Sequence, residues 1–232
     1  MKKLSVFMLL SCVSLLTACS QITILNPKST TGKEQAYLIW FSLAIMLIVL
    51  IVVFILFVWF VLKYRHTKNR PEHVATEDTG NKTLELTYTI IPIILLIILA
   101  IPTVNITLDQ SPSTEAAKDQ NGTKVEVTAK QFAWDFKHAN GKKEINELVI
   151  PESEPIVLKL KSADVVHSFW VPELAGKVDT YPNKTLTYVI KNPEKGTYQG
   201  KCAEFCGTNH ADMTFEVKVV SKENYQKYLE QS

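Results

Sequence analysis

The chain contains two long uncharged segments in its first half and short segments of alternating character in its second half. Residues 36–62 carry no charged side chain over 27 positions, and residues 86–108 carry none over 23 positions. An α-helix rises about 1.5 Å per residue, so both segments are long enough to cross a hydrocarbon core about 30 Å thick. Pro92 and Pro102 interrupt the second segment, but proline is tolerated in membrane helices. The pattern predicts a two-helix transmembrane hairpin over residues 36–108.

A third apolar segment, at the N-terminus, is too short to span a bilayer and is typical of an export signal. Two lysines precede the apolar residues 4–16, and the segment ends in Leu-Thr-Ala followed by Cys19. Leucine, two small residues and cysteine resemble the lipobox of bacterial lipoproteins. The resemblance implies that residues 1–18 are a signal peptide that is removed and that Cys19 is lipidated. An ordinary signal peptide or an uncleaved hydrophobic N-terminus is the alternative.

The densest basic cluster of the chain lies between the two predicted membrane helices and consists of Lys63, Arg65, Lys68 and Arg70. Lysine and arginine accumulate in cytoplasmic loops, so we expect this loop to face the cytoplasm. The N-terminal segment, residues 19–35, and everything after residue 108 then lie on the outer side. The sequence therefore predicts a two-pass protein of the bacterial plasma membrane with an extracytoplasmic C-terminal domain.

The extracytoplasmic half begins with a polar segment, residues 109–123, which contains proline and glycine and is typical of a linker. Short β-branched or alternating segments separated by turn signals follow, and they predict an all-β sandwich or barrel over residues 124–221. A C-terminal tail, residues 222–232, is predicted to be helical over 222–231. The predicted strands are residues 124–136, 148–150, 156–160, 165–171, 185–190, 197–200 and 213–220.

Charge and composition exclude two classes of protein. The 232 residues include 25 Lys+Arg and 23 Asp+Glu, a formal charge of +2, and the segment from residue 109 onward has 16 Lys and 18 acidic residues, or −2. Such a weak field argues against nucleic-acid binding, which requires a concentrated basic surface. Four cysteines are too few for a disulfide-dense scaffold of this length.

The candidate chemistry lies in twelve residues just before the last predicted strand. Residues 202–213 read CAEFCGTNHADM, which spaces Cys202, Cys206, His210 and Met213 at gaps of four, four and three. Thiolate, imidazole and a weak thioether are the ligands of copper electron-transfer sites, whereas zinc sites usually complete their set with Cys or His. A mononuclear blue-copper site uses one cysteine. Two cysteines would let two copper ions share both sulfurs, and each ion would then need its own imidazole.

A second histidine with a strand-like context is His167, in the sequence DVVHSFW. His138 stands beside Asn140 and Gly141 in a predicted turn, so we expect it to be solvated. A different interpretation remains open: Cys202 and Cys206 could form a disulfide in an oxidising compartment. His167 and Met213 would then be ordinary residues of the core.

Together these residues resemble subunit II of haem–copper cytochrome c oxidases, from the first predicted membrane helix onward. CxExCxxxHxxM is that family's signature for the dinuclear copper centre called CuA, and residues 164–179, DVVHSFWVPELAGKVD, match its upstream motif. The resemblance implies a cupredoxin-like Greek-key barrel that carries the centre. The resemblance implies that the thiolates of Cys202 and Cys206 bridge the two coppers. His167 and His210 would bind one copper each. The Met213 thioether would be a weak ligand of one copper, and the backbone carbonyl of Glu204 a ligand of the other.

The resemblance also implies the setting of the protein. It would be one subunit of an oxidoreductase that accepts electrons from cytochrome c and passes them to haem in subunit I. Oxygen is reduced there and protons are translocated; subunit III is a further expected partner, and no residue of this chain is catalytic. The Glu204 carboxylate would help bind magnesium at subunit I. Glu85, in the sequence TLELTYTIIP, falls where a proton-uptake carboxylate occurs; the alternative is a helix-start charge.

One position departs from the family pattern. Many members carry tryptophan two residues before Trp134, where electrons arrive from cytochrome c, and this chain has Phe132 there. The docking surface is therefore expected to differ, with contact closer to the copper loop or with another donor. Acidic residues that could attract a basic cytochrome, or could simply be solvated, are Glu144, Glu147, Glu152 and Glu154.

Other classes of protein fit the sequence less well. Quinol oxidase subunit II would share the hairpin and barrel, and residues 24–28 resemble some of those proteins, but that class has lost the copper ligands. A copper-delivery protein would carry its cysteine pair near the start of a thioredoxin-like fold. Nitrous oxide reductases share the copper motif on a much longer chain without a membrane hairpin. A disulfide-stapled structural lipoprotein is the last alternative.

Overall fold

The computed structural model describes residues 22–66, 80–113 and 121–231, and it divides into two compact units. One unit is residues 37–109, and the other combines the residues up to 36 with those from 110 onward. The predicted signal peptide, Cys19, the middle of the predicted cytoplasmic loop and residues 114–120 of the predicted linker lie outside the described residues.

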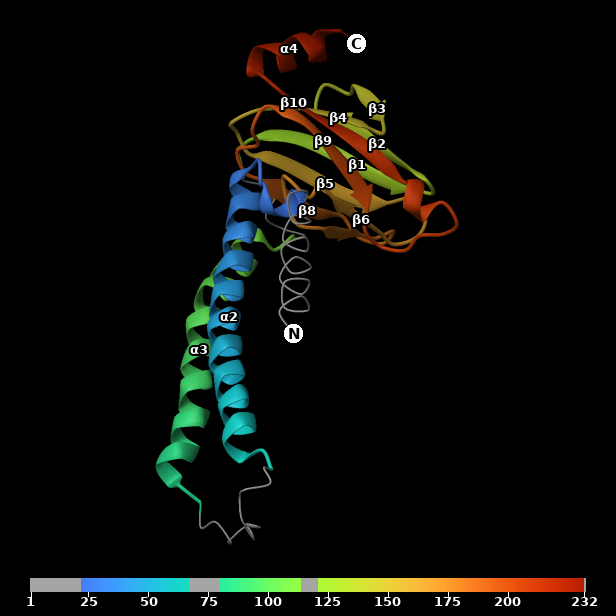
Figure 1. Ribbon diagram of the computed structural model, residues 1–232. Coiled ribbons are helices and arrows are strands. Elements are labelled where there is room, and N and C mark those ends of the chain that lie inside the picture. Colours follow the sequence, from blue (N-terminus) through green and yellow to red (C-terminus); the bar gives the residue numbers. More distant parts are fainter. Residues whose placement is uncertain (1–21, 67–79, 114–120, 232) are drawn as a thin grey trace, which may run out of the picture. The chain divides into compact units, whose positions relative to one another are not determined.

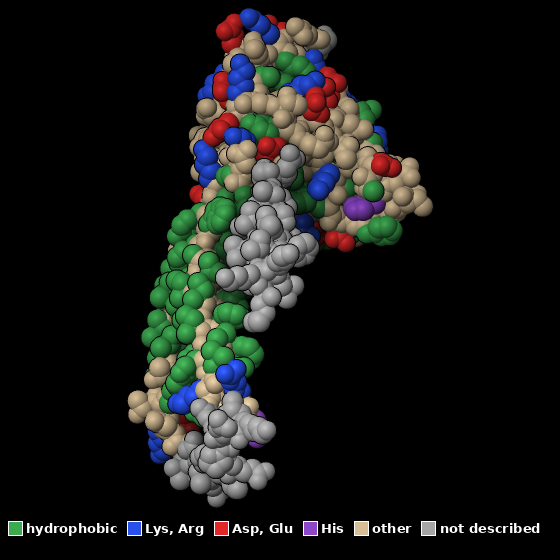
Figure 2. Space-filling model, viewed as in Figure 1, with side chains coloured by type: hydrophobic (Ala, Val, Ile, Leu, Met, Phe, Trp, Pro, Cys, Tyr) green, Lys and Arg blue, Asp and Glu red, His purple; other side chains and the backbone are tan. Residues whose placement is uncertain are grey.

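The two predicted membrane segments form two long helices, α2 (Thr30–Tyr64) and α3 (Lys82–Gln110) (Figure 1). Their most apolar stretches have mean hydropathies of 3.5 and 2.5, and none of the residues in those stretches is buried within the structure. Hydrophobic side chains make up most of the side-chain surface that is visible along the two helices (Figure 2). A helix that is apolar around its whole circumference must be covered by lipid or by another protein, so both helices are candidate membrane spans.

Both helices begin earlier than the apolar pattern predicts. The N–H of Gly32 donates to Ser29 Oγ (2.8 Å), which caps α2, and Thr30 N–H donates to the carbonyl of Lys191 (2.9 Å). Asn81 Oδ1 accepts the N–H groups of Thr83 and Leu84 at the start of α3. The capped first turns are polar, and a search for uncharged segments therefore leaves them out.

The second unit is built on two five-stranded sheets. The first has the order β3-β2-β1-β5-β8, and the second has the order β4-β10-β9-β6-β7. All neighbouring strands are antiparallel except the pairs β1–β5 and β4–β10. The strands of the first sheet are β1 (Thr123–Lys130), β2 (Ala133–His138), β3 (Lys143–Ile145), β5 (Ile156–Ser162) and β8 (Leu186–Ile190). Those of the second are β4 (Glu147–Pro151), β6 (His167–Trp170), β7 (Val178–Thr180), β9 (Gly196–Cys202) and β10 (Thr214–Val220).

Aromatic side chains from both sheets meet in the core of this unit. The ring of Trp134 on β2 lies 5.7 Å from that of Phe169 on β6 and 5.3 Å from that of Phe215 on β10, measured between centroids. All three residues are buried. The sheets therefore pack face to face with their alternating apolar side chains inward, and the predicted all-β class is confirmed.

The predicted strand over residues 124–136 is in fact two strands, β1 and β2, joined by a tight turn at Gln131 and Phe132. The sequence prediction missed this turn because it contains neither glycine nor proline, so the alternation reads as continuous. The three-residue strands β3 and β7 also escaped prediction, since three residues carry too little periodicity to be recognised.

The prediction that His138 is solvated is wrong. His138 is the last residue of β2 and is 1% exposed, and its Nδ1 shares a hydrogen bond with the hydroxyl of Tyr225 (3.0 Å). Tyr225 lies on the C-terminal helix α4 (Lys222–Glu230), which covers the histidine. The turn at residues 139–142 exists, but its sequence carries no information about a helix whose Tyr225 lies 87 residues downstream.

Candidate metal centre

The sulfur and imidazole side chains singled out from the sequence lie together at one end of the sandwich. His167 begins β6, and Cys202 ends β9. A ligand loop, residues 203–213, joins β9 to β10 and supplies Cys206, His210 and Met213; His210 begins the short helix η3 (His210–Asp212). The antiparallel pairing of β6 with β9, which sets Phe169 opposite Cys202, brings the upstream histidine to the loop.

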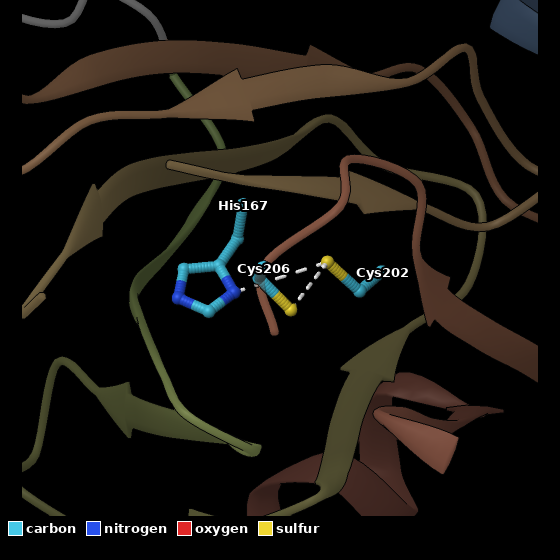
Figure 3. Close-up of side chains that lie close together, drawn as sticks. All are labelled: His167, Cys202 and Cys206. Carbon is cyan, nitrogen blue, oxygen red and sulfur yellow. Dashed lines mark hydrogen bonds between the residues drawn. The ribbon is translucent and has the colours of Figure 1, made fainter. Parts of the chain in front are cut away.

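The side chains of His167, Cys202 and Cys206 point toward one another (Figure 3). The two Sγ atoms are 3.9 Å apart, and His167 Nδ1 lies 3.8 Å from Cys202 Sγ. Cys206 Sγ lies 3.6 Å from His210 Nδ1 and 3.7 Å from Met213 Sδ. The backbone oxygen of Glu204 lies 3.2 Å from Cys202 Sγ. Each sulfur therefore has an imidazole nitrogen within 3.8 Å.

The two cysteines are free thiols in the structure, although both are buried. A disulfide would bring their sulfurs to about 2.05 Å, so the disulfide alternative does not describe this geometry. A metal–thiolate bond of about 2.3 Å, as in zinc sites, lets two sulfurs share one ion when they are at most about 4.6 Å apart. The separation of 3.9 Å meets this condition. The donor set therefore fits soft metal ions bridged by two thiolates.

Electrostatics in the metal-free cluster favour the neutral thiol. Burial, followed by repulsion from Cys202, raises the pKa of Cys206 to about 11. Thiols must lose their protons to bind a metal. The positive charge of a bound ion is what would offset the cost of placing two thiolates side by side in this buried position.

His167 is oriented by Asp164, a residue that the sequence reasoning quoted in the motif without assigning it a role. His167 is fully buried, and its Nε2 lies 2.8 Å from Asp164 Oδ1, which leaves Nδ1 facing the sulfurs. Partial burial raises the pKa of Asp164, but hydrogen bonds from His167 and from the backbone of Gln131 and Val165 outweigh it and lower that pKa. A carboxylate on the outer nitrogen of a ligating histidine is a recurrent feature of metal sites.

The outer side of the cluster carries an exposed aromatic residue. Phe205 is 76% exposed, and its ring lies 5.8 Å from that of the partly exposed His210. Phe132, by contrast, is partly buried and packs against Gly207, where an added Cβ would lie 3.0 Å from its ring. Gly207 also has φ +136°, so both space and backbone conformation favour glycine there. Phe205 and Gly207 were missed because nothing in their local sequence distinguishes them.

The remaining site predictions stay predictions. Glu204 is partly exposed, and its proposed magnesium role concerns a partner subunit. Glu85 lies in the first turn of α3, a placement that also suits its alternative role as a helix-start charge. Of the four acidic residues considered for docking, Glu147 pairs with Lys218 and Glu154 with Lys222. Lys222 follows β10, whereas the ligand loop precedes it, so Glu154 lies far from the candidate metal centre.

Comparison with known proteins gives two family matches that together cover most of the chain. Residues 18–106 match the cytochrome c oxidase subunit II transmembrane domain, and residues 125–220 match the periplasmic domain of the same subunit. The chain is 38% identical over 237 residues to cytochrome c oxidase subunit 2 of Alkalihalophilus pseudofirmus, an alignment that covers 99% of this chain and 68% of that protein. The chain belongs to the subunit II family of haem–copper oxidases.

The relatives of this subunit II include a second class. This chain is 33% identical over 234 residues to quinol oxidase subunit 2 of Bacillus spizizenii, in an alignment that covers 100% of this chain and 73% of that protein. A solved structure of the periplasmic domain of subunit II of cytochrome oxidase from Bradyrhizobium japonicum is 26% identical, with a TM-score of 0.46 over 48% of this chain and 94% of that one.

Family membership makes the protein a subunit of a membrane oxidase. Its two apolar helices correspond to the transmembrane domain of the family, and its cupredoxin-like β-sandwich corresponds to the periplasmic domain. The protein is thus a two-pass membrane subunit with an extracytoplasmic C-terminal domain. Because its relatives are both cytochrome c oxidases and quinol oxidases, membership alone does not identify the electron donor.

Proposed function

We propose that this subunit II carries a dinuclear CuA centre, accepts electrons from cytochrome c and passes them to haem in subunit I. The observation that carries the proposal is the convergence of two thiols, two imidazoles and a thioether in one cluster, of which only His210 is partly exposed. A quinol oxidase subunit II is expected to lack the copper ligands, so their presence favours cytochrome c as the donor.

The residues of the cluster have distinct roles in this proposal. Cys202 and Cys206 would hold both ions through their thiolates, His167 and His210 would each hold one, and the Met213 thioether and the Glu204 carbonyl would be weak ligands. A dinuclear copper centre supplies one-electron acceptance and donation. The protein holds the ligands on β6, on β9 and in the ligand loop between β9 and β10, so little rearrangement would accompany a change of charge.

The proposed contact with the donor lies over His210. This histidine is the ligand nearest to solvent, and Phe205 offers an exposed aromatic ring beside it. Around it, Glu204 and Asp212 add negative charge that suits a basic partner. Phe132 is too buried to offer comparable area, so the contact shifts from its position to the ligand loop.

The metal content is tested on the full chain purified within its oxidase complex. Wild-type protein should hold two copper ions in this subunit, and its paramagnetic resonance spectrum should show one electron shared over two copper nuclei. Cys206→Ser should abolish the shared signal, because one bridging sulfur is lost. Thr208→Ala, a change at an exposed position of the same loop, is the matched control and should leave it intact. A wild-type subunit without copper would refute the proposal.

The donor is tested by turnover of the same complex with reduced cytochrome c and with quinol. We expect oxidation of cytochrome c, and Phe205→Ser should lower its kcat/KM about tenfold, the effect of losing an interface residue of moderate importance. Ile145→Ser is the matched control, since Ile145 is 64% exposed but lies on β3, the edge strand of the sheet that does not contain β9 and β10. Equal effects of the two substitutions would remove Phe205 from the docking surface, and turnover with quinol alone would overturn the proposed donor.

A further inference from the structure

Three chain segments meet at the candidate metal centre, and two residues that are not ligands connect them. The turn between β1 and β2 contributes Gln131, the loop between β5 and β6 contributes Asp164, and the ligand loop contributes the backbone of Cys206. Within the described residues, these contacts join His167 on one side of the cluster to the ligand loop on the other.

The Asp164 carboxylate is the centre of this connection. Its Oδ1 lies 2.8 Å from Nε2 of His167 and accepts the N–H of Val165 (2.7 Å), and its Oδ2 accepts the N–H of Gln131 (2.7 Å). The carboxylate side chain is 32% exposed, whereas the His167 ring is fully buried. One carboxylate therefore fixes both the ring of a proposed ligand and the backbone of the neighbouring turn.

Gln131 extends the connection to the ligand loop. Its side-chain amide donates to the carbonyl of Cys206 (2.5 Å), and the same amide nitrogen would lie 3.0 Å from a Cβ on Gly207. The missing side chain at Gly207 thus allows the glutamine to reach the loop. A carbonyl held in this way fixes the peptide next to the bridging sulfur.

We propose that Gln131 and Asp164 form a clamp that positions His167 and Cys206 relative to each other for metal binding. The proposal rests on the proposed CuA function, in which His167 and Cys206 bind copper from different segments of the chain. Both clamp residues are positioning residues, since neither has an atom among the ligands. Groups that orient metal ligands typically change metal affinity 10- to 100-fold when they are replaced.

The test measures the rate at which a chelator removes copper from the full chain within its oxidase complex. Asp164→Asn replaces one of the two carboxylate oxygens by an amide nitrogen. The remaining oxygen cannot accept the hydrogens of both His167 and Gln131. We expect copper loss to become about tenfold faster, with a shifted reduction potential. The matched control is Asp212→Asn, which removes the same charge from the ligand loop and should change the rate less than twofold. Equal rates for the two variants would overturn the clamp.

A second measurement works without copper and separates failure of the clamp from failure of the proposed function. In copper-free protein, Gln131→Leu should let an alkylating reagent reach the buried Cys206 thiol about fivefold faster, because the loop has lost one hydrogen bond. Gln199→Leu is its control, since Gln199 on β9 also donates to a backbone carbonyl, that of Phe215 (3.0 Å). An unchanged alkylation rate in Gln131→Leu refutes the clamp even if the subunit binds copper. A faster alkylation rate in Gln131→Leu supports the clamp even if the subunit does not bind copper.

Discussion

The extracytoplasmic domain buries two histidines, His138 at the end of β2 and His167 near the turn between β1 and β2. The groups that face their ring nitrogens differ. His167 has a carboxylate on one ring nitrogen and thiols facing the other. His138 has the Tyr225 hydroxyl on Nδ1, and its Nε2 has no hydrogen-bond partner in the described part of the chain. Burial alone therefore does not mark a functional histidine; the atoms facing its two nitrogens do.

The pKa of His138 agrees with a structural role. Burial, with a smaller contribution from the positive charge of Lys142, lowers it to about 4. The ring is then neutral at the pH of most environments, and it packs between β2 and α4 against the rings of Tyr225 and Tyr228. Among the described residues, the group of histidine and cysteine side chains close enough to hold a metal ion contains His167 and not His138.

The largest expected difference between the two histidines is in metal binding. His167→Asn should abolish the electron-sharing signal of the two coppers, because one ion loses its imidazole, while the fold is retained. His138→Asn should leave copper content and spectrum as in the wild type. Copper analysis and paramagnetic resonance of the purified complex check both outcomes. Loss of the signal in both variants would show that the two ends of the domain are not independent.

The second difference is in the response to acid. The unfolded pKa of His138 is near 6.5 and the folded value is about 4, so between these values the unfolded chain binds a proton that the folded domain does not. The free energy of unfolding should therefore fall with decreasing pH across this window, by about 3 kcal/mol in total.

Thermal unfolding of the copper-free protein, followed between pH 7 and 4, measures this loss. Other groups titrate in the same range, so the comparison is with His138→Gln, whose side chain has no charge to gain. The variant should be less stable at pH 7 but should lose less stability on acidification. Parallel pH profiles for the two proteins would mean that His138 does not titrate as proposed.

The smallest effect concerns the hydrogen bond that joins His138 to α4. Tyr225→Phe removes the hydroxyl and leaves a second ring nitrogen unsatisfied, which should lower the free energy of unfolding by about 1 kcal/mol. Tyr228→Phe is the control, because its hydroxyl contacts Glu144 at 3.4 Å nearer the surface. Neither change should alter copper binding. An equal effect of the two substitutions on the thermal midpoint would mean that the His138 contact contributes nothing specific.

Much of the candidate site could be predicted because its residues are close in sequence. Cys202, Cys206, His210 and Met213 fall within twelve positions, and a loop of that length keeps them near one another in any compact fold. His167 lies 35 residues upstream, and the sequence could nominate it only by its strand-like context. The pairing of β6 with β9 is what places it opposite Cys202.

Two parts of the sandwich show why the rest could not be predicted. The turn at Gln131 and Phe132 contains neither glycine nor proline. Its shape depends on hydrogen bonds to Asp164 and Cys206, which lie 33 and 75 positions away. The start of α2 similarly depends on the carbonyl of Lys191. Contacts at such separations leave no periodic signal in the local sequence.

The sequence by itself determined the two membrane helices, the all-β class of the domain and the types of ligand available. Uninterrupted hydropathy, alternation and the chemistry of sulfur and imidazole are all local properties. Only the tertiary structure decided which histidine faces the thiols, which one is buried beneath a helix, and which carboxylate orients the first. Those outcomes depend on strand register and on packing between distant segments, because hydrogen bonds and burial are set by the partner that folding brings, and not by the neighbours along the chain.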